Sequence, residues 1–286
     1  MQQTVGYKIV ELANGVHSVH SLAERETFHP VIGPVAEAEA LYVKQLRLPE
    51  RLAAHEGEFV IWDVGLGAAA NVLTVLRSTR AATCPLRVIS FDHTLEPLRF
   101  ALENGDALGY FNDYENAVEK MLRDQQVIFS DASREIKWEL RLGDFPTLIR
   151  DPQFAAGNPA PHAILFDAFS PAKNPAMWTA PLFADLFALL DPARPCALPT
   201  YSRSTMLRVS LLLAGFFVGA WHATGEKEET TIAANTLDLI SEPLDKKWLQ
   251  RAHNSTSAEP MWEPIYRQAP LTEATWEKLR QHPQFK

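Results

Sequence analysis

The sequence contains only two cysteines, Cys84 and Cys196, among 286 residues. Two thiols provide neither a disulfide framework nor a four-ligand zinc site, so we expect a reducing, cytoplasmic setting. Long hydrophobic runs are missing as well: the most apolar stretch, 211–221, is far shorter than the roughly 20 residues that span a bilayer. No basic region leads into an apolar one at the amino terminus. We therefore expect neither a signal peptide nor a membrane partner.

Positive charge is not in excess: the sequence has 27 Lys and Arg residues and 35 Asp and Glu residues, which gives a formal charge of −8. This balance disfavours a protein that holds nucleic acid on a broad basic face, although it leaves room for a local basic groove. The nine histidines show no HxH or HExxH spacing, so we expect no metal. No repeat or low-complexity tract occurs, and the 47% hydrophobic content is that of an ordinary globular protein.

Short apolar runs of strand length alternate with helical patterns along the chain. The runs are 59–64 (FVIWDV), 87–92 (RVISFD), 163–167 (AILFD) and 196–201 (CALPTY). The helical patterns are 69–77, 95–103, 116–124, 180–190 and 204–214. Strands that alternate with helices predict an α/β protein with a parallel sheet covered on both faces.

Three further segments complete the predicted sheet. Residues 136–142 alternate apolar and polar side chains, which indicates a strand with one more exposed face. Segments 216–222 and 230–240 are separated only by a polar turn at 223–229, which predicts a hairpin. The result is a mostly parallel, seven-stranded sheet that ends in an antiparallel hairpin. We expect three regions: an extension over the ligand face at 1–58, the main domain at 59–242, and an irregular tail packed on it at 243–286.

The segment Asp63-Val-Gly-Leu-Gly67 follows the first predicted strand directly and precedes a predicted helix. Glycines at Gly65 and Gly67 let the backbone pass close to a ligand, and the helix N-terminus offers free N–H groups. The third glycine of the dinucleotide-binding fingerprint is absent, because alanines occupy positions 68–70. A plain strand-to-helix turn is therefore the alternative to a cofactor site.

Acidic residues end the next two strands of the predicted sheet. Asp92 ends the second strand, where a carboxylate in nucleoside-binding α/β folds accepts hydrogen bonds from both ribose hydroxyls. The alternative is an acid that favours the dipole of the helix that follows. Asp144 closes the alternating strand and is a candidate for the adenine amino group, with surface solvation as its alternative.

The loop DAFSPAKNPAMW, residues 167–178, follows the strand at 163–167 on the face where open α/β sheets bind ligands. Its two prolines hold the loop extended, and Asp167, Lys173 and Asn174 give it polar groups that a plain connector does not need. A carboxylate at a strand end, followed by an aromatic residue, is the arrangement by which several amino-methylating enzymes place a carboxylate beside an amine. A rigid loop whose aromatic residues only pack is the alternative.

With these motifs, the chain resembles the MnmC-type tRNA methyltransferases. The resemblance covers most of residues 24–242: ETFH at 26–29, AEAE at 36–39, then DVGLG, ISFD, LGD and the DAFSP loop. The DAFSP loop is the specific motif, and the others are shared among many methyltransferases. The layout of five parallel strands and a hairpin is that of Rossmann-like methyltransferases, whereas dehydrogenases normally lack the hairpin. The chain would resemble the stand-alone form, without the flavin-dependent oxidase domain of bifunctional members.

The resemblance implies an enzyme that uses S-adenosyl-L-methionine to methylate the amine of 5-aminomethyl-(2-thio)uridine at the wobble position of tRNA. Asp63, Gly65, Gly67, Asn71, Asp92 and Asp144 would then bind the cofactor, and Asp167 would orient the amine and accept its proton. Candidate substrate residues lie in the matched motifs, offer a ring for stacking on a base, or offer positive charge. They are Glu26, Phe169, Lys173, Asn174, Trp178, Tyr201 and Arg203.

Two other functions stay open. The charge of −8, with Glu226, Glu228 and Glu229 opposing the basic rim of Lys173, Arg203 and Arg208, favours a diverged S-adenosylmethionine enzyme that acts on another amine. The missing third glycine favours a non-catalytic, methyltransferase-like binding module. Cofactor binding separates the module from the two enzymes, and nucleoside analysis of tRNA separates the enzymes from each other.

Overall fold

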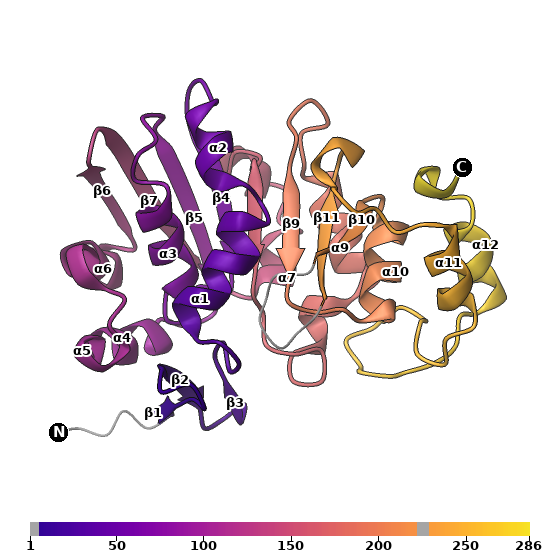
Figure 1. Cartoon of the computed structure of the whole chain (residues 1–286), viewed down its shortest axis with the longest axis horizontal. Helices are drawn as coiled ribbons and strands as arrows, with labels where there is room; N and C mark the ends of the chain where they lie inside the picture. The colour runs from indigo at the N-terminus through magenta and orange to yellow at the C-terminus, as the bar shows by residue number, and fades with distance from the viewer. Residues whose placement is uncertain (1–5, 222–228) are drawn as a thin grey trace. The chain divides into compact units, whose positions relative to one another are not determined.

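The computed structural model describes residues 6–221 and 229–286 of the chain (Figure 1). These residues form two compact units, and the division falls within a β-strand. We call residues 6–144 and 165–167 the first unit, and residues 145–164, 168–221 and 229–286 the second unit. No helix among these residues combines the length and the apolar character needed to cross a membrane.

The sheet of the first unit has three parallel neighbours, β4 (Phe59–Val64), β5 (Leu86–Asp92) and β7 (Arg134–Leu142). Every residue of β4 is buried, as the continuous apolar run predicts. An antiparallel strand, β6 (Gln126–Asp131), pairs with β7 at the edge. Because of β6, the large sheet of the described chain has eight strands rather than the seven expected.

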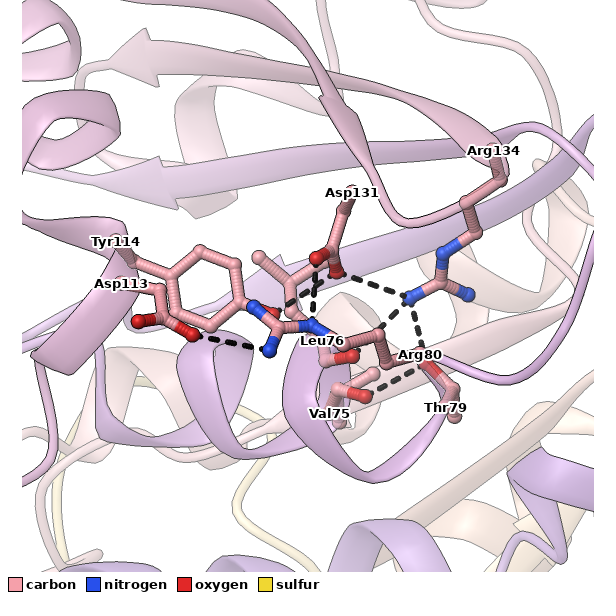
Figure 2. A network of polar contacts seen from close by, with 8 residues as sticks. All are labelled: Val75, Leu76, Thr79, Arg80, Asp113, Tyr114, Asp131 and Arg134. Atoms are coloured by element: carbon pink, nitrogen blue, oxygen red, sulfur yellow. Dashed lines mark hydrogen bonds and ion pairs between the residues drawn. The ribbon is translucent and has the colours of Figure 1, made fainter.

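A polar network joins the hairpin of β6 and β7 to residues 75–80 and to residues 113 and 114, as Figure 2 shows. The Asp131 carboxylate accepts hydrogen bonds from Arg80 Nε at 2.7 Å and from the Tyr114 hydroxyl at 2.9 Å. Arg134, whose side chain is fully buried, donates from Nη2 to Leu76 O at 3.1 Å and to Thr79 Oγ1 at 3.0 Å. Burial of the Arg134 guanidinium lowers its pKa from the ordinary value. The network therefore ties the edge hairpin to the rest of the first unit.

Four helices of the first unit follow its strands. They are α3 (Ala70–Ser78), α4 (Glu96–Glu103), α5 (Gly105–Leu108) and α6 (Glu115–Asp124), with a short 3-10 helix η2 (Asn112–Tyr114) before α6. The three predicted helices at 69–77, 95–103 and 116–124 are confirmed to within one residue at each end. In α6, the buried side chains are Ala117, Val118 and Met121, the spacing of one helical face.

The amino-terminal segment belongs to the first unit. It forms a small antiparallel sheet of β1 (Tyr7–Glu11), β2 (His17–Ser21) and β3 (Glu26–Thr27), followed by α1 (Pro34–Ala38), a π-helical segment η1 (Glu39–Lys44) and α2 (Leu48–Ala53). The Phe28 ring, just after β3, lies against Gly67 of the glycine turn. The boundaries predicted for the three regions stay a prediction.

The second unit holds β8 (Ala163–Phe166), β9 (Ala197–Thr200), β11 (Thr230–Ala234) and β10 (Phe217–Trp221). Strands β8 and β9 are parallel, and β11 lies between β9 and β10, antiparallel to both. The last residues of β8, 165 and 166, belong to the first unit. The hairpin predicted from the sequence is therefore present, while most of its predicted turn, 223–229, lies outside the described residues.

The second hairpin strand ends earlier than expected, at Ala234 instead of residue 240. Asn235 stops it, because its side chain accepts from Cys196 N at 2.9 Å and donates to Arg194 O at 2.9 Å. The chain then turns into a 3-10 helix, η4 (Leu237–Leu239). Side-chain bonds to the backbone of this kind compete with a strand ladder.

The helices of the second unit are α7 (Phe145–Leu148), α8 (Phe154–Gly157), η3 (Pro175–Trp178), α9 (Ala180–Ala188), α10 (Thr205–Ala214), α11 (Lys246–His253), α12 (Glu273–Leu279) and η5 (Pro283–Phe285). The tail was expected to be irregular, and this was wrong for α11 and α12. Asp245 caps α11 by accepting from Trp248 N at 2.7 Å, and Thr272 caps α12 by accepting from Thr275 N at 3.2 Å.

Candidate active site

The glycine turn after β4 has a left-handed backbone at three positions. Gly65, Gly67 and Ala69 have φ values of 94°, 51° and 62°. A Cβ added at Gly67 would lie 3.2 Å from Cε2 of Phe28, so the backbone there is approached closely. Ala69, one residue before the position of the fingerprint's third glycine, also adopts the left-handed conformation, at a cost of roughly 1–2 kcal/mol. The turn therefore forms without the third glycine.

Asp92 lies at the end of β5 and organises the backbone around it. Its Oδ2 accepts a hydrogen bond from Gly67 N at 2.9 Å, and its Oδ1 accepts from His93 N at 2.7 Å and Thr94 N at 3.2 Å. Hydrogen bonding to this carboxylate is also the largest cause that raises the pKa of His93. His93 Nδ1 lies 3.2 Å from Oδ1 as well, so Oδ1 is fully used, whereas Oδ2 accepts only the Gly67 bond and can accept a further hydroxyl group while it holds the glycine turn.

We expect Asp92→Ala to weaken cofactor binding by roughly 10- to 100-fold. Hydrogen bonds to a charged group contribute about 1.5–3 kcal/mol each, and the variant also loses the bond that fixes Gly67. Isothermal titration with S-adenosylmethionine measures the change. Glu96→Ala, at an exposed position in the first turn of α4, is the matched control. Equal affinity in wild type and Asp92→Ala would remove Asp92 from the site.

Asp63 lies within β4 and is completely buried. Ser90 donates to its Oδ2 at 2.7 Å, and Ser90 in turn accepts from Trp138 Nε1 at 2.9 Å. Burial raises the pKa of Asp63 to about 7, against the lowering effect of the Ser90 bond, and the nearby charges of Asp167 and Asp92 raise it further. Its Oδ1 is a buried acceptor with no hydrogen-bond partner among the described residues.

Asp167 follows β8, beside the end of β4, where its N–H donates to Val64 O at 3.0 Å. Asn71 Nδ2, from the first turn of α3, donates to Asp167 Oδ2 at 2.7 Å. His29 Nε2 lies 3.5 Å from the same oxygen, and the Asp167 side chain is 17% exposed. A carboxylate held from two sides in this way can orient an amine and accept a proton from it.

The other ring nitrogen of His29 lies 3.7 Å from Glu37 Oε1, in α1. Both side chains are buried, at 8% and 7% exposure. Neither His29 nor Glu37 was predicted as a site residue. The sequence signal was present, since both fall in the ETFH and AEAE segments, but nothing local points from these segments to Asp167.

The remaining predicted residues of the first unit are Glu26 and Asp144. Glu26 lies in β3 opposite Ser21. Asp144 is exposed and follows Gly143, whose N–H donates to Asp92 O at 2.9 Å. The first unit thus brings Asp63, Gly65, Gly67, Asn71, Asp92 and Asp167 together around the ends of β4 and β5.

The loop after Asp167 is held by its own contacts in the second unit. Trp178 Nε1 donates to Phe169 O at 2.7 Å, and the Tyr201 hydroxyl donates to Ala168 O at 3.1 Å. The rings of Trp178 and Tyr201 meet edge to face, with centroids 5.9 Å apart. Trp178 is only 1% exposed, so its ring supports the loop rather than offering an open face to a base. Phe169 and Tyr201 are partly exposed.

The polar residues of this loop and its surroundings differ in exposure. Lys173 and Arg203 are exposed, and Asn174 is partly exposed. Arg208 was expected on a basic rim, and this was wrong: its side chain is 4% exposed and pairs with Glu229 at 2.5 Å. It also donates to Thr231 Oγ1 and Thr230 O, so it holds β11 in place. Glu226 and Glu228 lie outside the described residues.

A family model described as S-adenosyl-L-methionine-dependent methyltransferase matches residues 110–236. This segment contains β7, β8 and the DAFSP loop. The chain is an S-adenosyl-L-methionine-dependent methyltransferase. The predicted α/β, Rossmann-like fold and the predicted cofactor are confirmed for this methyltransferase.

Two similar proteins are named tRNA 5-methylaminomethyl-2-thiouridine biosynthesis bifunctional protein MnmC. The methyltransferase is 31% identical over 68% of its length to the protein of Aeromonas hydrophila subsp. hydrophila and 27% identical over 76% to that of Stutzerimonas stutzeri. It spans only 30% and 33% of the length of these relatives. The crystal structure of MNMC2 from Aquifex aeolicus has a TM-score of 0.71 with 23% identity, covering 98% of the methyltransferase and 85% of that chain, and supports the fold.

Among the described residues, no group of three or more His, Cys, Asp or Glu side chains is arranged to hold a metal ion.

Proposed function

We propose that this methyltransferase transfers a methyl group to the primary amine of 5-aminomethyl-(2-thio)uridine at the wobble position of tRNA. The observation that carries the proposal is the Asp167 carboxylate, at a strand end, held by Asn71 at 2.7 Å and next to His29 at 3.5 Å. The names of the MnmC relatives supply the tRNA and the nucleoside.

The residues of the first unit fit S-adenosylmethionine. A Cβ at Gly67 would press on Phe28, so a glycine there leaves room for the ring that packs on the turn. Asp63 Oδ1 is a buried acceptor without a partner among the described residues, suited to an ammonium group. Asp92 Oδ2 accepts a single bond and keeps acceptor capacity for a ribose hydroxyl. Asp63, Gly65, Gly67 and Asp92 would therefore hold the cofactor.

The bound cofactor supplies a methyl group that is already electrophilic. The protein must hold the substrate amine in line with that methyl group and remove the proton that makes the amine an ammonium ion. An aminomethyl group is mostly an ammonium ion at neutral pH, so it first has to lose a proton. Asp167 attracts the ammonium ion, orients it and accepts that proton.

Binding of tRNA requires positive charge on the substrate side of a protein whose formal charge is −8. Lys173 and Arg203 supply it at exposed positions, on the loop after Asp167 and just after β9. Arg208 does not contribute, because it is buried against Glu229. The acidic balance favours a second candidate, methylation of a small amine, and the two functions give different results with tRNA.

We expect Lys173→Glu and Arg203→Glu to weaken tRNA binding and to make it less dependent on salt. Each variant removes one phosphate contact, so the slope of log K against log salt falls by roughly 1. Filter binding or fluorescence anisotropy between low and physiological salt measures both effects. Lys247→Glu, at an exposed position of α11, makes the same change of charge as a control.

The test of the function itself uses the purified protein, S-adenosylmethionine and tRNA that lacks the methyl group. Nucleoside analysis should show the methylaminomethyl product. If the tRNA stays unchanged while a small amine from a panel is methylated, the tRNA proposal is wrong and the second candidate holds. If the protein binds no cofactor, both are wrong.

A further inference from the structure

Behind the Asp167 carboxylate lies a row of buried groups that the proposed reaction has not yet used. Glu37 Oε1 is 3.7 Å from His29 Nδ1, and His29 Nε2 is 3.5 Å from Asp167 Oδ2. The imidazole therefore separates two carboxylates, one from α1 and one from the end of β8. The 3.5 Å separation is at the long limit of a hydrogen bond, and such bonds often shorten when substrate binds.

The backbone at His29 is strained in a way that fits a functional position. Its φ is 48°, in the left-handed region that residues other than glycine rarely adopt. Residues held in such a conformation persist only where the surroundings fix them, and they gather at active sites. The preceding residue is fixed here: Phe28 N donates to Val19 O at 2.8 Å, and Ser18 Oγ donates to Phe28 O.

We propose that His29 is the proton acceptor behind Asp167, with Glu37 stabilising the imidazolium ion that forms. The inference rests on the proposed function, because it concerns the proton of the substrate amine. Since His29 acts through Asp167, it is a positioning and proton-accepting residue rather than a group that touches the substrate.

The proton and the electrons balance as follows in one turnover. The substrate ammonium ion gives a proton to Asp167 Oδ2, which passes it to neutral His29 at Nε2. The amine lone pair then forms the N–CH3 bond, the S–CH3 bond breaks, and its electron pair stays on sulfur. The product leaves as a secondary ammonium ion, and His29 releases its proton to water, one proton for each methyl group.

An imidazole behind Asp167 makes removal of the amine proton more favourable, because imidazole is a stronger base than a carboxylate. Reference pKa values are about 3.9 for an aspartic acid and about 6.5 for a histidine, so a proton on Asp167 moves on to His29 favourably. The charged groups shown next to the imidazole are Glu37 and Asp167, at the distances above. Glu37 stabilises the ring once it has taken the proton.

The test measures methyl transfer by His29→Gln and His29→Asn between pH 6 and pH 9. Glutamine offers an amide near the ring position, and asparagine tolerates the left-handed backbone better. We expect kcat to fall about 10- to 100-fold at pH 7, with KM and cofactor affinity unchanged. The loss should shrink toward pH 9, where more of the amine is already unprotonated. His20→Gln is the control, since His20 binds Thr27 Oγ1 within the small sheet.

A second measurement follows the imidazole itself and does not depend on activity. NMR titration should assign to His29 a signal that is absent in His29→Gln, and Glu37→Gln should lower its titration midpoint because a neighbouring negative charge is lost. A wild-type pH profile in both His29 variants, an equal loss at every pH, or an unchanged midpoint in Glu37→Gln would overturn the inference. If wild-type protein leaves tRNA unmethylated, the proposed function fails instead, and the titration still tests His29 and Glu37.

Discussion

Asp167→Asn should lower the rate of methyl transfer by about 10²- to 10⁴-fold while cofactor affinity stays near that of wild type. The amide has the shape of the carboxylate, so the loop after β8 keeps its packing, including the Trp178 bond to Phe169 O. The negative charge that attracts the ammonium ion is lost, and so is the oxygen that accepts its proton. Asn71 Nδ2 then faces a neutral group in place of its charged partner at 2.7 Å.

Single-turnover transfer at saturating cofactor measures this effect directly, and thermal unfolding shows whether the variant is folded. Asp106→Asn is the matched control, because Asp106 is an exposed aspartate of α5 in the same unit. A folded Asp167→Asn protein that transfers methyl groups as fast as wild type would refute the role. A variant that loses cofactor affinity to the same extent as rate would make Asp167 a cofactor-binding residue.

The strands that carry the site could be predicted because each is an apolar run that ends at a polar turn. Residues 59–64 form β4 over the same span as expected, and Asp92 ends β5 as expected. In a parallel sheet the carboxyl ends of neighbouring strands meet at one edge, so strand ends were enough to select Asp92 and Asp167, while Asp63 was selected with the glycine turn that follows it.

Other features depend on contacts that a local pattern does not show. Strand β6 turns into β7 through Ala132, with a φ of 57°, at a place without the glycine or asparagine that usually indicates a tight turn. His29 meets Asp167, and Glu37 meets His29, only through the fold, because both lie far from Asp167 in the chain. Arg208 was placed on the surface from its charge, whereas its partner Glu229 allows it to be buried.

Asp63→Asn should stabilise the protein above pH 7 and weaken cofactor binding. Burial raises the pKa of Asp63 from 3.8 to about 7 in the folded protein. Between these values the folded state holds the proton more tightly than the unfolded state, so the free energy of unfolding falls as pH rises, and the full cost is present above pH 7. At 1.36 kcal/mol for each unit, this cost is at most about 4 kcal/mol.

Asparagine has no charge to bury, and its oxygen can still accept the Ser90 bond. The difference in stability between Asp63→Asn and wild type should therefore grow from pH 4 to pH 7 and stay constant above. Urea unfolding over this range gives the difference, with Asp106→Asn as the control that should show no such trend. A variant less stable than wild type by the same amount at pH 5 and pH 8 would mean that Asp63 is already ionised and paired. In that case, burial of the ionised Asp63 carboxylate does not destabilise the folded protein. The role of Asp63 in the site would then be tested by cofactor affinity alone.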